Sequence, residues 1–450
     1  MNSLLFFGIF SLLGLIYFII GLRVGRTVTS TSDYYLAGRS LGIAQVTSNL
    51  IATQLGGGML LGTAMASYTH GVYGIVYTLG MSIGFILLAC GIAARLQQFN
   101  VSTTAQLFQT QYHSIFLKKV ASLLSICTLF GILIAQVVGF KSLMYALGFT
   151  NIWSIIPFWL SVVAYTMAGG LRAITINDMI QLTLIITIFS SLFIRDAFVH
   201  GLSNITQFAM SMTRPSQSLI ATILMPALFS LFQQDLAQRF FASRSQRTAT
   251  LSACYAGLFL LVFACIPLYF GIQPRLTNMS VPEGANPLIV YLENTVPTLL
   301  FALAMCAIIA AIISTADALL NGISANITQD FNITDSRGGM TVSKIITGIV
   351  GLSALIASYF VPLHIIDIII SSYELSVSCL LVPLLVCYFT PKVSTWAAYG
   401  SIVGGFIGFI GIRFISLPGK EIVSLLLSCI GYILGMYIQK TTQRTYKFSQ

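Results

Sequence analysis

Long runs of apolar residues, separated by short polar joints, follow one another along the whole chain. A helix needs about 20 apolar residues to cross a bilayer, and thirteen runs approach that length, with no joint longer than about 25 residues. This pattern predicts an all-α polytopic membrane protein with about 13 transmembrane helices and no room for a soluble catalytic domain. The predicted spans are 4–22, 43–69, 72–95, 118–146, 151–169, 174–195, 216–238, 247–271, 293–326, 342–360, 364–389, 393–414 and 421–439.

Composition supports the same interpretation. Hydrophobic residues make up 56% of the chain and charged residues 8%, whereas a soluble domain carries roughly a quarter of its residues as charged types. The net charge of +10 does not indicate nucleic-acid binding, because that needs basic residues clustered on a soluble face. None of the eight cysteines forms a CxxC pair, and metal-ligand spacing with the four histidines is absent. An intramembrane enzyme is therefore not indicated, and no cofactor is expected.

The basic residues predict the orientation of the chain. If the N-terminus lies outside, the inner joints and tail hold sixteen Lys and Arg and the outer joints hold five, which satisfies the positive-inside rule. The run 4–22 has no basic segment before it and no small-residue cleavage site, so we expect a retained span and not a signal peptide. We expect an integral protein of a bacterial inner (plasma) membrane with a cytoplasmic C-terminus.

Acidic residues inside apolar runs are costly and usually face a partner or a wet cavity. Five are candidates, each with the alternative of a capped helix end or a structural hydrogen bond. Because few basic residues lie at the same depth, Asp235, Asp317 and Glu374 favour a cationic or zwitterionic solute, such as a quaternary amine or an amino acid, although Lys141 could neutralise one of these acids. The candidates are Asp178, Asp235, Asp317, Asp367 and Glu374.

Two segments have the composition of helix interruptions. Ala52–Gly58 contains three consecutive glycines, each costing a helix about 1 kcal/mol relative to Ala; close helix packing through small residues is the alternative. Ala310–Asp317 holds the adjacent hydroxyls of Ser314 and Thr315, which could contribute oxygens to a Na⁺ ion or could bond back to carbonyls of their own helix.

Four motifs, in order along nearly the whole chain, resemble those of the sodium/solute symporter family. The first two are Asp33-Tyr-Tyr-Leu-Ala-Gly-Arg-Ser-Leu-Gly42 and Gly169-Gly-Leu-Arg-Ala-Ile174 with Asn177, Asp178 and Gln181. The others are Gln238-Arg-Phe-Phe-Ala242 and Ala310-Ala-Ile-Ile-Ser-Thr-Ala316. Within the family, the segments around Gly56 and Ser314 look most similar to the choline-transporter branch.

The resemblance implies a leucine-transporter-type fold of two inverted five-helix repeats. The repeats would occupy 43–196 and 216–390, preceded by a first helix and cytoplasmic loop (1–42). Two extra helices and a short cytoplasmic tail (391–450) would follow. In this architecture ligands bind near the membrane midplane beside discontinuous helices.

The resemblance also implies functional residues. Sodium would bind the carbonyls of Ala52, Leu55 and Ala311 and the hydroxyls of Ser314 and Thr315. Asp178 would lie on the ion's inward exit path. Gln54 stands where proline-transporting relatives carry an Asp, and Pro226 and Ser230 replace their aromatic residues, which argues against proline. The implied substrate contacts are Gln54, Gly56, Phe229, Gln233, Gln234 and Glu374.

The sequence thus predicts Na⁺-coupled secondary active symport of a small organic solute by alternating access, with Na⁺ and the solute as ligands in the bilayer and no nucleic-acid partner. A proton-coupled carrier on the same scaffold would use Asp178 or Glu374 instead. A membrane sensor without transport would need an output domain, and the tail after residue 439 is short.

Overall fold

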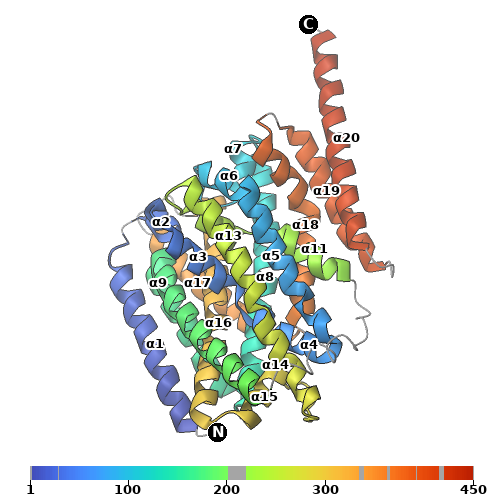
Figure 1. The fold of residues 1–450 in the computed structure, drawn as a ribbon. Coiled ribbons are helices and arrows are strands. Elements are labelled where there is room, and N and C mark those ends of the chain that lie inside the picture. The colour runs from blue at the N-terminus through green and yellow to red at the C-terminus, as the bar shows by residue number, and fades with distance from the viewer. Residues whose placement is uncertain are drawn as a thin grey trace.

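The computed structural model describes residues 3–28, 30–149, 151–200, 219–333, 339–361, 365–391, 393–414 and 420–448. Within these ranges the regular secondary structure is helical, apart from one isolated backbone bridge between Leu41 and Ser243. The helices pack into one bundle, with α1 (Ser3–Gly25) on one flank and the pair α19 (Thr395–Gly411) and α20 (Lys420–Phe448) on the opposite flank (Figure 1).

The helices of the first half of the chain extend to residue 200. They are α2 (Thr31–Leu36), η1 (Ala37–Arg39), α3 (Ile43–Gln54), η2 (Gly58–Gly62), α4 (Thr63–His70), η3 (Gly71–Ile75), α5 (Val76–Leu87), η4 (Leu88–Ile92), α6 (Ala93–Gln98), α7 (Gln106–Thr110), α8 (Ile115–Ala146) and α9 (Ile152–His200).

The second half begins at α11. It contains α11 (Leu219–Ser230), α12 (Gln234–Phe241), α13 (Gln246–Phe263), α14 (Cys265–Leu276), α15 (Pro287–Thr295), α16 (Thr298–Ala325), η5 (Asn326–Asp330), α17 (Gly339–Ala357), α18 (Ile365–Phe389) and η6 (Ile412–Phe414), besides α19 and α20.

Nine helical stretches in the described residues are long and apolar enough to cross a membrane, and three shorter apolar helices accompany them. Large apolar side chains on the outside of the bundle are consistent with a lipid environment; Leu12, Leu15 and Phe18 of α1 are 40–59% exposed. The prediction of a polytopic all-α protein is confirmed, whereas the count of thirteen spans stays a prediction.

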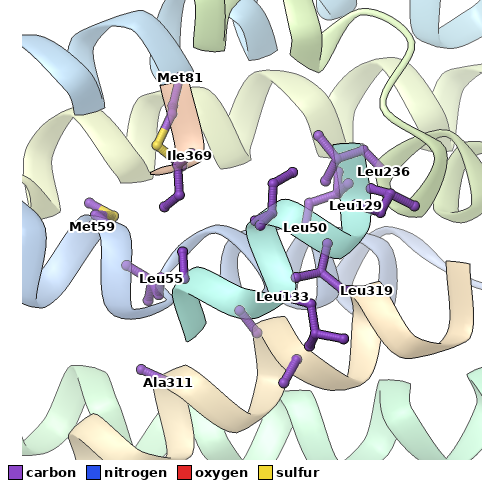
Figure 2. Close-up of a cluster of buried hydrophobic side chains, with 14 of the residues drawn as sticks. Leu50, Leu55, Met59, Met81, Leu129, Leu133, Leu236, Ala311, Leu319 and Ile369 are labelled. Atoms are coloured by element: carbon purple, nitrogen blue, oxygen red, sulfur yellow. The ribbon is translucent and has the colours of Figure 1, made fainter. Parts of the chain in front are cut away.

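Helix α16 lies at the centre of the bundle. Its most apolar window is 83% buried, the largest share among the nine stretches, and it packs against α3, α8, α9 and α17. Figure 2 shows part of the surrounding core, in which Leu133 of α8, Leu319 of α16, Leu50 of α3 and Leu236 of α12 lie together. The central helix therefore has protein on most of its faces, and its polar residues must find partners inside the bundle.

Three breaks in the helices matter for the site. The first lies at Leu55 and Gly56, between α3 and η2, and confirms the predicted interruption at 52–58. The second, which the sequence analysis did not predict, lies at 231–233 between α11 and α12. The third is a sharp bend in α9 at Gly170, between the predicted spans 151–169 and 174–195. The predicted interruption at 310–317 is wrong, because α16 is continuous from Thr298 to Ala325.

Candidate sodium and solute site

The end of α3 presents backbone carbonyls that lack their usual helical partners. In a continuous helix the Thr53 carbonyl would accept a hydrogen bond from the Gly57 amide, four residues on. Here the Gly57 amide instead donates to Oε1 of Gln136, on α8, at 2.9 Å. The three glycines at 56–58 make the departure from helix inexpensive, so the break leaves carbonyl oxygens available to a neighbouring helix or a ligand.

The hydroxyls of α16 meet these carbonyls. The Ser314 hydroxyl donates to the Ala52 and Ala311 carbonyls, both at 2.9 Å. The Thr315 hydroxyl lies 2.7 Å from the Thr53 carbonyl and 3.2 Å from that of Ala311. Oxygens from two helices more than 250 residues apart in sequence therefore converge, and both hydroxyls are buried.

The oxygen set fits a partly dehydrated Na⁺ ion. Secondary transporters with broken helices coordinate Na⁺ through carbonyls of the unwound segments. Here Ala52, Thr53, Ala311, Ser314 and Thr315 bring neutral oxygens together. Of the predicted ligands, all but the Leu55 carbonyl take part in these contacts. The Thr53 carbonyl was not predicted.

A cavity of about 20 Å³ adjoins these oxygens. That volume accommodates about one water molecule, so the structure shows the site closed around a space too small for an organic solute. The lining comes from both broken helices and from α5, α8, α16 and α18. The lining residues are Thr53, Gln54, Gly56, Gly58, Met59, Tyr77, Ile132, Gln136, Gln233, Thr315, Leu319, Ile369 and Tyr373.

Three glutamine side chains give the cavity its polar groups. The Gln54 amide has no hydrogen-bond partner among the described residues. Gln136 uses its oxygen for Gly57, and Gln233 uses its amide nitrogen for Asp235 Oδ2 at 2.9 Å. The NH₂ group of Gln136 is therefore left over as a donor, and the side-chain oxygen of Gln233 as an acceptor.

Aromatic residues of α5 and α18 also line the cavity. The hydroxyls of Tyr77 and Tyr373 lie 3.3 Å apart. Phe229 stacks on Tyr373 from behind, with ring centroids 4.5 Å apart and an interplanar angle of 25°. The predicted residue Phe229 therefore supports the site through Tyr373 and does not line it.

Two predicted solute contacts lie elsewhere. Gln234 is turned to the loop before α7: its side-chain oxygen accepts from the Thr104 backbone amide at 2.7 Å, and its nitrogen donates to the Ser102 carbonyl at 3.2 Å. Glu374 is only partly buried and does not line the cavity, whereas its neighbour Tyr373 does. The helix rotates by about 100° per residue, so Tyr373 faces the cavity in this closed form, and a solute contact by Glu374 stays a prediction.

The other candidate carboxylates do not line the cavity either. Asp317 accepts hydrogen bonds from the hydroxyls of Tyr165 and Thr166 on α9. One oxygen of Asp235 accepts from Gln233. No Asp, Glu, Lys or Arg is among the residues that line the cavity. These acids therefore do not line the closed cavity themselves, and the class of solute stays a prediction.

Asp178 lies in a buried polar cluster beside α3. Neither of its carboxylate oxygens has a hydrogen-bond partner within the described residues. Arg239 of α12, itself fully buried, interacts electrostatically with Asp178 and Asp235, and its Nε donates to Asn49 Oδ1 at 2.8 Å. The cluster joins α3, α9 and α12. A role for Asp178 on the ion's exit path stays a prediction.

The family model for the sodium:solute symporter family matches residues 34–408, and this match covers more than half of the chain. The chain belongs to this family. It is accordingly an integral membrane transporter and not an enzyme, and it couples solute movement to Na⁺.

Relatives agree with this assignment. The sodium/pantothenate symporter of Escherichia coli (strain K12) is 23% identical over an alignment 447 positions long that covers 92% of this chain and 92% of that one. Among solved structures, a substrate-bound, outward-open Na⁺-coupled sialic acid symporter superposes with a TM-score of 0.76 at 15% identity, covering 96% of this chain and 97% of that one.

A second solved structure extends the fold comparison. Mhp1, a nucleobase-cation-symport-1 family transporter in a closed conformation with bromovinylhydantoin bound, superposes with a TM-score of 0.63 at 13% identity, covering 92% of this chain and 96% of that one. These likenesses confirm the leucine-transporter-type fold that the sequence motifs implied.

Proposed function

We propose that Na⁺ binds between the broken end of α3 and the middle of α16 and drives uptake of a small polar solute into the adjacent cavity. The ion would be held by the carbonyls of Ala52, Thr53, Leu55 and Ala311 and by the hydroxyls of Ser314 and Thr315. The observation that carries this proposal is the convergence of both hydroxyls on carbonyls at 52 and 53, at 2.7–2.9 Å.

The solute site of this proposal differs from the one expected from sequence. Gln54 and Gly56 of the first break and Gln233 of the second remain, while Gln136, Tyr77 and Tyr373 replace Gln234 and Glu374 because they line the cavity. Phe229 holds the Tyr373 ring in place. The break in α3 thus contributes to both the ion site and the solute site, so an ion bound there can favour solute binding through linkage.

We infer that the solute carries no net positive charge. The lining residues offer neutral amides and hydroxyls and no carboxylate, while a bound Na⁺ would place a positive charge beside the solute. Two like charges repel strongly at short range in a medium of low dielectric constant. Neutral and zwitterionic solutes, including amino acids, fit these surroundings, and quaternary amines do not.

The transport cycle would use alternating access between the two five-helix repeats, 43–196 and 216–390. With the N-terminus outside, as the basic residues indicate, inward Na⁺ movement gains about 2.3 kcal/mol per charge for each 100 mV of membrane potential. The ion would leave toward the cytoplasm past Asp178. A bacterial inner membrane supplies such a potential.

The sodium site can be tested with purified protein in proteoliposomes. We expect a Na⁺ gradient to drive accumulation of a radiolabelled solute. The double variant Ser314→Ala/Thr315→Ala should raise the Na⁺ concentration for half-maximal uptake by roughly fivefold or more, since each lost polar contact in a buried site costs about 1–3 kcal/mol.

The matched control removes two hydroxyls that bond only to their own helices. Thr183 and Ser353 are exposed, and each donates to a carbonyl four residues earlier at 2.8 Å. Thr183→Ala/Ser353→Ala should keep the wild-type Na⁺ dependence. Uptake that follows a pH gradient and ignores Na⁺ would favour the proton-coupled alternative.

The solute class is tested by competition. A panel of neutral, zwitterionic, anionic and quaternary-ammonium compounds is added during Na⁺-driven uptake, and inhibition is measured for each. We expect neutral or zwitterionic compounds to compete and quaternary amines to fail. Competition by quaternary amines alone would overturn the inference about charge and leave the sodium site untouched.

A further inference from the structure

A second pocket, of about 290 Å³, lies at the end of α1, away from the sodium and solute site. It is formed by the last turn of α1, by the segment from η1 into α3, and by α9 just after its bend. Its polar lining residues are Arg23, Thr27, Ser40, Gln45, Arg172 and Thr175.

The pocket is rich in unused hydrogen-bond donors. Neither Arg23 nor Arg172 has a hydrogen bond or an ion pair within the described residues, and no carboxylate is among the lining residues. Arg39, by contrast, is engaged: it donates to the Phe99 and Val101 carbonyls at 3.2 and 3.0 Å. Gln45 accepts from the Gly42 amide at 2.9 Å, which leaves its NH₂ as a further donor.

The three hydroxyl groups of the pocket already donate their protons to backbone carbonyls and are not available as donors to a ligand. Those of Thr27 and Ser40 donate to carbonyls of their own segments, at 2.7 and 2.9 Å, and that of Thr175 donates to the Leu171 carbonyl at 2.8 Å. Two guanidinium groups and one amide are therefore the free donors, a set that suits a phosphate group.

The position of the pocket along the membrane normal indicates that the phosphate belongs to a lipid headgroup. Arg23 directly follows the apolar run 4–22, so it stands where α1 leaves the hydrocarbon layer. Leu22 beside it is 43% exposed, and Ile180, one turn beyond the lining residue Ile176, is 36% exposed. Apolar side chains available to acyl chains thus adjoin a basic pocket at headgroup level. Basic pockets between transmembrane helices on the cytoplasmic side bind anionic headgroups.

We propose that this pocket binds the phosphate of an anionic phospholipid, with Arg23 and Arg172 as its ligands and the acyl chains against Leu22 and Ile180. The site belongs to the leaflet at the inner end of α1. It does not depend on the sodium or solute site.

The test is native mass spectrometry of the delipidated full-length protein titrated with dioleoyl phosphatidylglycerol or, for comparison, dioleoyl phosphatidylcholine. The wild type should retain the anionic lipid preferentially. An arginine near the membrane surface contributes about fivefold to the binding of anionic lipid, so Arg23→Gln/Arg172→Gln should weaken retention on the order of 25-fold. Arg23→Lys/Arg172→Lys should keep most of it.

The control variant loses the same two positive charges at positions outside the pocket. Arg26 and Arg95 are exposed and do not line it, so Arg26→Gln/Arg95→Gln should retain the lipid like the wild type. Unchanged retention in the Arg23/Arg172 variant, or an equal loss in the control, would overturn the proposal. Displacement of the lipid by millimolar inorganic phosphate would also overturn it, because the pocket would then bind a free anion. Should the double variant unfold, Arg23→Gln alone, at an exposed position, decides the matter by its expected fivefold loss.

Discussion

Gly56 occupies a position where oxygens from two other helices leave no room for a side chain. A β-carbon built there would lie 2.3 Å from Thr315 Oγ1 and 2.7 Å from Gln136 Oε1. The absence of a side chain at this one residue therefore allows α8 and α16 to approach the broken end of α3. Both neighbouring side chains have buried partners of their own, so neither can move away without losing a hydrogen bond.

Gly56→Ala should therefore impair transport, although it adds only one methyl group. Overpacking of this kind costs about 1–3 kcal/mol, and we expect Na⁺ affinity in the uptake assay to fall about fivefold or more. Gly8→Ala is the control, because a β-carbon there meets nothing within 4 Å. Equal Na⁺ dependence in the two variants would show that the site tolerates rearrangement around residue 56.

At the residue scale, the sequence identified the site residues that belong to local motifs. It did not identify those whose place in the site depends on tertiary packing or on the rotation of a helix. Ser314, Thr315, Ala52 and Ala311, the sodium ligands that the motifs implied, converge in the structure, and their binding of Na⁺ stays a prediction. Gln136 could not be predicted, because it lies 79 residues from Gly57 on a largely apolar helix and only tertiary packing joins them. Whether Tyr373 or Glu374 faces the cavity depends on the rotation of α18, which an almost uniformly apolar helix does not reveal.

At the scale of elements, helix α9 is interrupted at a single residue whose backbone angles are not helical. Gly170 has φ +60° and ψ −166°, a conformation essentially restricted to glycine. A β-carbon there would also lie 2.6 Å from the Tyr34 ring and 2.6 Å from its carbonyl oxygen. Both the backbone angles and the packing of α2 against α9 therefore require glycine at the junction of the two predicted spans.

Gly170→Ala should lower the thermal unfolding midpoint of the purified protein in detergent. Backbone strain alone costs about 1–3 kcal/mol, and the contact with Tyr34 adds to it. Gly148→Ala separates the two contributions, since Gly148 has φ +88° but a β-carbon there meets nothing within 4 Å. We expect a smaller drop for Gly148→Ala, and an equal drop in both variants would mean that packing against Tyr34 contributes little.

Helix breaks were predictable only where the local composition disfavours a helix. Three glycines marked the break in α3, but Ser314 and Thr315 did not break α16, because both hydroxyls accommodate a continuous helix by bonding to the Ala311 carbonyl. The break at 231–233 lies in Leu-Phe-Gln, which contains neither Gly nor Pro. The tertiary contacts of Gln233 and Gln234 on either side of it could not be inferred from local sequence.

At the scale of the whole molecule, the cavity is too small for its proposed solute, so transport requires the bundle to open. The space of about 20 Å³ is bounded by segments from both proposed repeats: α3, η2, α5 and α8 from the first, and the break at 231–233, α16 and α18 from the second. Movement of one repeat against the other would enlarge it toward one side of the membrane at a time. A ligand shifts such an equilibrium only through its different affinity for the two states.

Ile132 offers a probe of this opening. It lines the cavity from α8 and is 3% exposed, so the variant Ile132→Cys should react slowly with a membrane-impermeant cationic thiol reagent in the closed state. If Na⁺ stabilises an outward-open state, Na⁺ should increase the labelling rate of Ile132→Cys in intact cells several-fold over that in K⁺, and transported solute should reduce it again.

Two controls accompany this measurement. The labelling of the parent chain, whose native cysteines remain, is subtracted. Asn278→Cys, in the exposed joint between α14 and α15 that the basic residues predict to lie outside, should label at the same rate in either salt. Sodium-independent labelling of Ile132→Cys beside a labelled Asn278→Cys would contradict a Na⁺-stabilised outward-open state, whereas an unlabelled Asn278→Cys would contradict the predicted orientation.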